Sequence, residues 1–285
     1  MKLHEDKFDL ISNRANPKLL MHELPFSMET CTYQVSESIE LFPIDCLRDL
    51  GIKVVDDGTW SQHIHQVATV GKAAAAWVLS VFKTRSRKVM LTLYKSLIRS
   101  HLEYCCPLWH PDKIQDIQKL EGIQRTFTKK IAGLSNMNYW ERLASLKLMS
   151  LQRRRERYII IQMWKLLHKI TPNDVNVQFS RNQRLGWKAV VPSWENHSRA
   201  ANRNLYENSF AVVGPQLWNT LPVALNTIQT KNTFKYRLTD FLSKLPDEPP
   251  VRNYARAHKN TLHDVLRRSP VEARLRRGSP IEGIT

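Results

Sequence analysis

The sequence predicts a mainly α protein, with a small β-hairpin near its N-terminus and a basic C-terminal tail that is disordered. Three observations lead to this fold class. Apolar residues recur at helical spacing between Ser61 and Ile170, whereas the residues before Ser61 hold only short apolar runs. Pro and Gly separate the helical segments by short connections, which favours a compact bundle. After Pro246 apolar residues are sparse and Arg is frequent, a composition typical of disordered chains.

Residues 1–58 contain two runs with strand character. Thr32–Leu41 alternates weakly between apolar and polar residues, and Cys46–Val55 is a second apolar run. Pro43 and Asp45 lie between them, so each run is predicted to form one strand of a loose hairpin.

Asp56 and Asp57 follow the second run and raise a question of chemistry. Two adjacent carboxylates after a β-branched run resemble the corner where a polymerase holds the metal ions that activate the primer hydroxyl. The other interpretation is a turn that leads into the first helix.

Four helices with one apolar face each are predicted next. The first begins at Ser61, with Thr59 or Ser61 as its cap. The second follows Ser86 and ends at Pro107, the third runs from Asp112 to Gly133, and the fourth from about Leu151 to Ile170. The second is expected to turn inward Met90, Leu93, Tyr94, Leu97, Ile98 and His101. The third is expected to turn inward Ile117, Leu120, Gln124, Phe127 and Ile131.

Residues 171–245 are less regular, and one amphipathic helix is predicted from Thr233 to Leu242. Trp187 and Trp194 lie among Gly, Pro and Asn. They could stack on exposed bases, but filling a small core is the interpretation that we favour for both.

Charge narrows the class of partner. The 285 residues carry a formal net charge of +17, which suits a polyanion such as nucleic acid. No apolar run approaches the roughly 20 residues that span a bilayer, and the first residues lack the apolar core of a signal peptide. We therefore expect no membrane partner, reduced cysteines and an intracellular location, nuclear or cytoplasmic.

Motifs for catalysis or cofactor binding are absent from the sequence. It contains no GxGxxG, GxxxxGK[ST], HExxH or GxSxG pattern. Cys105, Cys106 and His110 lie close together, but a structural zinc needs four ligands with spaced cysteines. We expect core cysteines here, and neither a metal nor a cofactor.

Several blocks together resemble one family. "LRDLGIKVVDDGTWSQHIHQV" is followed by "LYKSLIRSHLEYCCPLWHP" and "IQKLEGIQRTFTKKIAGL", then by "YWERLASLKLMSLQRRRERYIIIQMWKLLH" and "SFAVVGPQLWNTLPVALNTIQTKNTFKYRLTDFL". In this order they resemble the C-terminal part of the reverse transcriptases of jockey-like non-LTR (LINE) retrotransposons, over about residues 5–242.

The resemblance implies four segments. They are a palm-end, primer-grip-like remnant (1–58), a helical thumb-like bundle (59–170), a post-thumb block (171–245) and the disordered basic tail (246–285). "DLGI" resembles the primer-grip motif, which singles out Leu50 and Gly51. The family's catalytic carboxylates lie upstream of everything matched here, so Asp56 and Asp57 are expected to form a turn, and no catalytic residue is assigned.

The thumb of that family holds the template–primer duplex through its backbone, which implies RNA and DNA as partners, without sequence preference. Two basic clusters are candidates for this contact. One is Arg153, Arg154, Arg155 and Arg157, for which a solvated helix start is an equally good interpretation. The other is Arg125, Lys129 and Lys130, of which the first two share a helix face.

The sequence thus predicts a truncated remnant of a reverse transcriptase, inactive on its own, that retains nucleic-acid affinity. Two alternatives remain open. The chain could be the C-terminal piece of an active RNA-directed DNA polymerase, or a co-opted or decayed protein-interaction module. The oligomeric state is not predicted.

Overall fold

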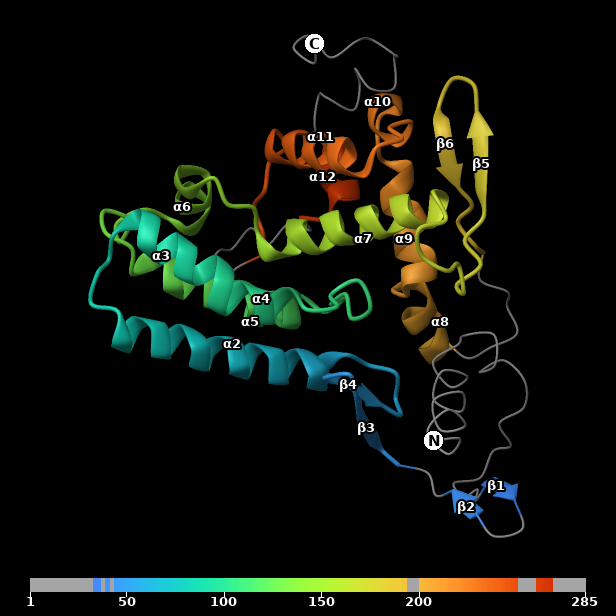
Figure 1. Cartoon of the computed structure of the whole chain (residues 1–285), viewed down its shortest axis with the longest axis horizontal. Helices are drawn as coiled ribbons and strands as arrows, with labels where there is room; N and C mark the ends of the chain where they lie inside the picture. The colour runs from blue at the N-terminus through green and yellow to red at the C-terminus, as the bar shows by residue number, and fades with distance from the viewer. Residues whose placement is uncertain (1–32, 37–38, 42–43, 194–199, 251–259, 269–285) are drawn as a thin grey trace. The chain divides into compact units, whose positions relative to one another are not determined.

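The computed structural model describes residues 33–36, 39–41, 44–193, 200–250 and 260–268 (Figure 1). The fold is mainly helical, as predicted. The chain divides into two compact units, one made of residues 1–63 and 193–207, the other of residues 64–192 and 208–285. The division falls inside the first described helix, α2 (Ser61–Val81).

The described part of the first unit contains two antiparallel hairpins and a short helix. The hairpins pair β1 (Tyr33–Ser36) with β2 (Ile39–Leu41) and β3 (Cys46–Asp49) with β4 (Ile52–Val55). The helix is α8 (Ala200–Glu207).

Each predicted strand run is therefore a hairpin of its own, which corrects the pairing expected from the sequence. In the second hairpin, Leu50 and Gly51 form the two-residue turn, with φ angles of 44° and 85°. Two positive φ values in succession match the twist of a tight hairpin. The reversal was missed because Leu is not a turn-forming residue, although glycine at the second position favours it.

Asp56 and Asp57 form a turn, as expected. The Asp57 carboxylate accepts hydrogen bonds from the backbone N–H of Thr59 (2.8 Å) and from its hydroxyl (3.1 Å). The Gly58 N–H donates to the Val55 carbonyl, and Gly58 has a φ of 68°. The carboxylates thus stabilise the entry into α2.

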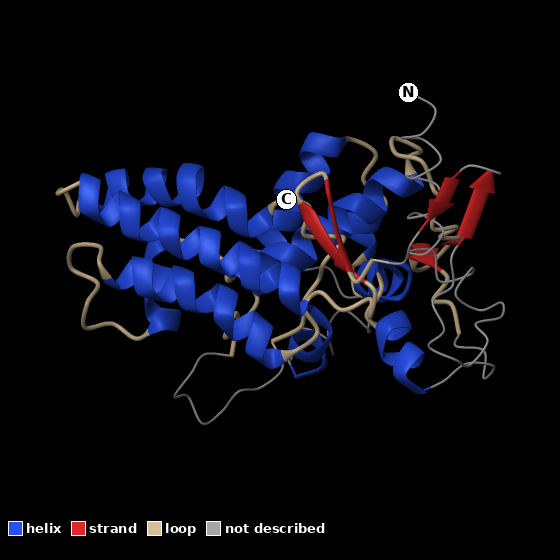
Figure 2. Cartoon of the chain, turned by 90° about the horizontal axis from the view of Figure 1, so that it is seen from below, coloured by secondary structure: helices blue, strands red, loops and turns tan. Residues whose placement is uncertain are grey.

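In the second unit, α2 packs against a long interrupted helix and α5 (Ile114–Lys129) (Figures 1 and 2). The interrupted helix consists of α3 (Arg87–Leu93), the π-helix η1 (Tyr94–Ile98) and α4 (Arg99–Glu103). At Gly71 the packing is close, because an added Cβ would lie 2.5 Å from Leu102 and 3.3 Å from Ile123. The core positions predicted for the third helix are confirmed, from Ile117 to Ile131.

The π-turn corrects the inward face predicted for the second helix. Met90, Tyr94, Ile98 and Leu102 are buried, whereas Leu97 and His101 are exposed. One turn of i→i+5 hydrogen bonding adds a residue and shifts the later side chains around the axis. A regular 3.6-residue period cannot anticipate this shift.

Helix α6 (Tyr139–Leu146) was not predicted. Asn138 caps it, accepting a hydrogen bond from the Glu141 N–H while the Glu141 carboxylate accepts one from the Asn138 N–H, both at 2.9 Å. This capping box is a local signal that the sequence carries.

A second core forms around α7 (Leu151–Leu167). The elements that share it are the β5–β6 hairpin (Phe179–Asn182, Gly186–Ala189), α9 (Phe210–Asn219), α10 (Val223–Asn226), α11 (Lys231–Ser243) and α12 (Leu262–Arg268). The second unit therefore runs across the boundaries expected at 170 and 245. The helix expected over Thr233–Leu242 lies within α11.

The described part of the segment after Pro246 is ordered, in contrast to the disordered tail expected from its composition. Leu262 and Leu266 belong to the second core, and Asn260 is buried. The apolar residues are few, but Leu262, Val265 and Leu266 of α12 occur at helical spacing and pack into the core that α7 and α9 share. Residues 251–259 and 269–285 lie outside the described part.

Candidate nucleic-acid interface

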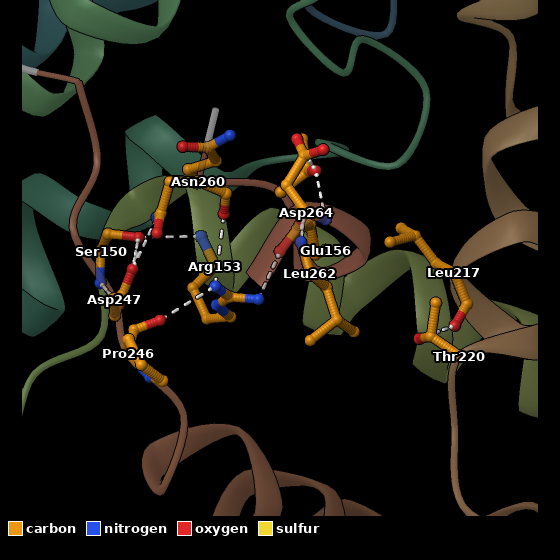
Figure 3. Close-up of polar contacts among 12 residues, drawn as sticks. Ser150, Arg153, Glu156, Leu217, Thr220, Pro246, Asp247, Asn260, Leu262 and Asp264 are labelled. Atoms are coloured by element: carbon orange, nitrogen blue, oxygen red, sulfur yellow. Dashed lines mark hydrogen bonds and ion pairs between the residues drawn. The ribbon is translucent and has the colours of Figure 1, made fainter. Parts of the chain in front are cut away.

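Arg153 lies in the protein interior and contacts the C-terminal segment (Figure 3). Its side chain is fully buried, and its guanidinium donates to the backbone carbonyls of Pro246 and Asn260, each at 3.3 Å. It also lies 3.2 Å from the Glu156 carboxylate, an ion pair whose angles do not make a hydrogen bond. Burial raises the pKa of Glu156 to about 7, against the opposing effect of Arg153.

The same segment provides hydrogen-bond partners for the first residues of α7 and its N-cap. Asp247 accepts from the Ser150 N–H and hydroxyl, both at 2.7 Å, and Glu156 accepts from the Leu262 N–H at 2.8 Å. Arg153 and Glu156 thus anchor a distant part of the chain.

Arg155 is also fully buried, and its three guanidinium nitrogens have no hydrogen-bond partner among the described residues. Burial lowers its pKa, which the charges of Glu121 and Cys106 partly counteract. Burial raises the pKa of Glu121 to about 7, partly offset by Arg155. The environment is a low-dielectric interior with compensating charges, closed to a large polyanion.

Arg154 and Arg157 are half-buried and are held by side chains of other helices. The Arg154 guanidinium donates twice to the Glu103 carboxylate, once at 2.8 Å, and once to the Tyr158 hydroxyl at 2.9 Å. Arg157 donates to the Thr239 hydroxyl at 2.9 Å. Partners supplied by α4 and α11 leave these groups little freedom to contact phosphate.

The arginine run of α7 is therefore not the exposed basic surface expected from the sequence. For Arg153 and Arg155 that expectation is wrong, because their side chains are buried. Neither phosphate contact nor a solvated helix start, the two roles expected from the sequence, describes these two buried side chains.

The second basic cluster lies at one end of α5 and is accessible. Lys129 and Lys130 are exposed, and Arg125 is half-buried. The Ala132 N–H donates to the Arg85 carbonyl at 2.9 Å. This bond brings the chain after α5 to the connection between α2 and α3.

That connection and the first turn of α3 add three exposed cations on this side of the bundle. We call Lys83, Arg87, Lys88, Lys129 and Lys130 the basic end of the bundle. Arg85 holds the connection in place, donating to the carbonyls of Leu79 (2.9 Å), Phe82 and Thr84 (3.0 Å). The basic end therefore rests on a fixed backbone.

Local helix stability explains only part of this clustering. Cations are favourable near helix C-termini, which covers Lys83 after α2 and Lys129 in α5. Arg87 and Lys88 instead occupy the first turn of α3, where the helix dipole disfavours positive charge. The helix dipole therefore does not account for the placement of these two cations.

A sequence signal for the basic end exists and was missed. The chain has no Asp or Glu between Asp57 and Glu103, and none between Glu121 and Glu141. The densest run of basic residues indicates the α7 arginines as the polyanion contact. The two stretches without acidic residues instead indicate α2, α3 and the end of α5.

The remaining candidates lie elsewhere. Leu50 and Gly51 form the hairpin turn of the first unit, with the Leu50 side chain exposed. Trp187 lies half-buried in β6 and packs against the second core, and Trp194 lies outside the described residues. Among the described residues no group of His, Cys, Asp or Glu could hold a metal ion, and no helix could span a membrane.

The chain matches no protein-family model, and no curated protein or solved structure matches it significantly. The resemblance to reverse transcriptases thus rests on the sequence blocks alone.

Proposed function

We propose that the chain binds RNA or DNA without sequence preference, and that the basic end of the bundle is the contact surface. The proposal retains the thumb-like role implied by the sequence blocks, with no catalysis by the isolated chain. The observation that carries it is the convergence of five exposed cations from two acid-free segments on one end of the bundle.

Phosphate contact fits the chemistry of this surface. Lys and Arg provide affinity by displacing the counterions of the nucleic-acid backbone, a contribution that does not depend on base sequence. Arg85 fixes the loop through three backbone carbonyls, so little backbone entropy is lost when the surrounding cations bind.

The experiment compares two variants of equal charge in the full-length chain. One changes the five residues of the basic end to Gln. The control changes five exposed cations elsewhere, namely Lys147, Arg181, Arg184, Lys231 and Lys244. Fluorescence anisotropy measures the affinity of each for two duplexes of unrelated sequence.

We expect the basic-end variant to lose at least tenfold in affinity for both duplexes, and the control to lose much less. An equal loss in the two variants would mean that overall charge, including that of residues 246–285, attracts the polyanion. No binding by the parent chain would favour the protein-interaction module.

A further inference from the structure

An exposed tryptophan lies beside the basic end. Trp77 is 55% exposed near the C-terminal end of α2. Phe82 meets its ring edge-on, with ring centroids 6.3 Å apart. Phe82 is the first residue after α2, and Lys83 of the basic end directly follows it in the chain.

Nothing in the bundle core requires an aromatic side chain at this position. The buried face of α2 is formed by Ile64, Ala68, Gly71, Ala75 and Val78, and Trp77 does not belong to that stripe. Large exposed aromatics next to cations are typical of ligand surfaces, because they provide a large contact area at low conformational cost.

We infer that Trp77 is a stacking platform for an unpaired base, and that the basic end prefers single-stranded nucleic acid over duplex. This inference rests on the proposed function of the same surface. Phosphates of the strand would contact the cations, while one base lies on the free face of the indole.

The physical reason for the preference is access to the base. In a duplex the faces of internal bases are stacked on their neighbours, so the indole can gain only edge or end contacts. In a single strand each base has a free π-face, and stacking on an aromatic contributes whatever the sequence. The edge-on contact with Phe82 helps to fix the ring orientation while leaving a face accessible.

A protein partner is the competing occupant of an exposed tryptophan. The charge environment favours nucleic acid, because no acidic residue is present from 58 to 102 and the exposed cations Lys83, Arg87 and Lys88 follow the end of α2. This excess of positive charge would not favour binding of a protein unless that protein were itself strongly acidic.

The test uses three variants of the full-length chain, namely Trp77→Ala, Trp77→Phe and Val70→Ala. Val70 is a matched control, since it is 42% exposed on the same side of α2, two helical turns before Trp77. The probes are a single-stranded oligothymidylate and a hairpin duplex of equal phosphate number, at one salt concentration. The measured quantity is the ratio of single-strand to duplex affinity.

We expect Trp77→Ala to lower this ratio by about 5- to 150-fold, the range that corresponds to loss of one stacked base. Trp77→Phe should recover most of the ratio, and Val70→Ala should leave it unchanged. Indole fluorescence should be quenched by the single strand in the parent chain more than in Trp77→Phe.

An unchanged ratio in Trp77→Ala would overturn the stacking inference and favour a protein partner for this side chain. The proposed function would still stand in that case, provided that the five-residue Gln variant of the basic end loses affinity for both probes. If that variant binds like its control, the proposed function itself fails.

Discussion

Leu262 tests whether the chain beyond Pro246 belongs to the fold. Its side chain is fully buried in the core around α7, at the start of α12. Its N–H donates to the Glu156 carboxylate at 2.8 Å. Replacing a fully buried Leu by Ala removes apolar contacts and leaves a cavity, which costs about 2–5 kcal/mol.

The assay is urea unfolding followed by far-UV circular dichroism, with Leu185→Ala as the control because Leu185 is 51% exposed. We expect Leu262→Ala to lower the free energy of unfolding by about 2–5 kcal/mol, and Leu185→Ala by less than about 0.5 kcal/mol. If the two variants unfold alike, residues 260–268 do not pack against α7, and the composition-based expectation of a disordered tail is correct.

Three further predictions concern α7 and catalysis. Burial raises the pKa of Glu156 to about 7 from an ordinary 4.5, so ionisation of this carboxyl destabilises the fold as pH rises through this interval. The variant Glu156→Gln cannot ionise. Its free energy of unfolding, relative to that of the parent chain, should therefore rise by up to about 3 kcal/mol between pH 4.5 and pH 7. Thermal melts across that range measure the difference, and a constant difference would refute the assignment. Arg154→Gln removes one of the partners of the largely buried Glu103 carboxylate, which keeps Arg99 and the Tyr158 hydroxyl. It should lower the free energy of unfolding by about 1–3 kcal/mol, against almost nothing for the exposed Arg184→Gln. Equal melts of the two variants would mean that the pair is solvated. Primer extension with Mg²⁺ or Mn²⁺ should stay at background, and extension that Asp57→Asn abolishes would make the Asp pair a metal site.

The helical part of the fold could be predicted because its information is local. Apolar spacing identified α2, α5 and α7, and placed Gln124 at a core position of α5. That side chain is fully buried, accepting from the Tyr94 hydroxyl at 2.5 Å and donating to the Tyr139 hydroxyl at 2.9 Å. The spacing of apolar residues predicts that the Gln124 side chain points into the core, but it does not predict which side chains bind it there.

The role of the α7 arginines could not be predicted because their partners are distant in sequence. Glu103 precedes Arg154 by 51 residues, and Asn260 follows Arg153 by 107. A run of charges is usually solvated, and only tertiary packing brings the compensating groups to it. The basic end is the converse case, since each segment contributes few cations and only their convergence forms a surface.

Phosphate contact by the basic end is tested most directly by the salt dependence of duplex binding. Each phosphate contact contributes about 0.9 to the slope of log K against log salt concentration. We predict that changing the five cations of the basic end to Gln flattens the slope by roughly 2–4 units, whereas the five-residue control variant keeps the slope of the parent chain. An unchanged slope in the basic-end variant would contradict the claim and place the contacts elsewhere on the chain.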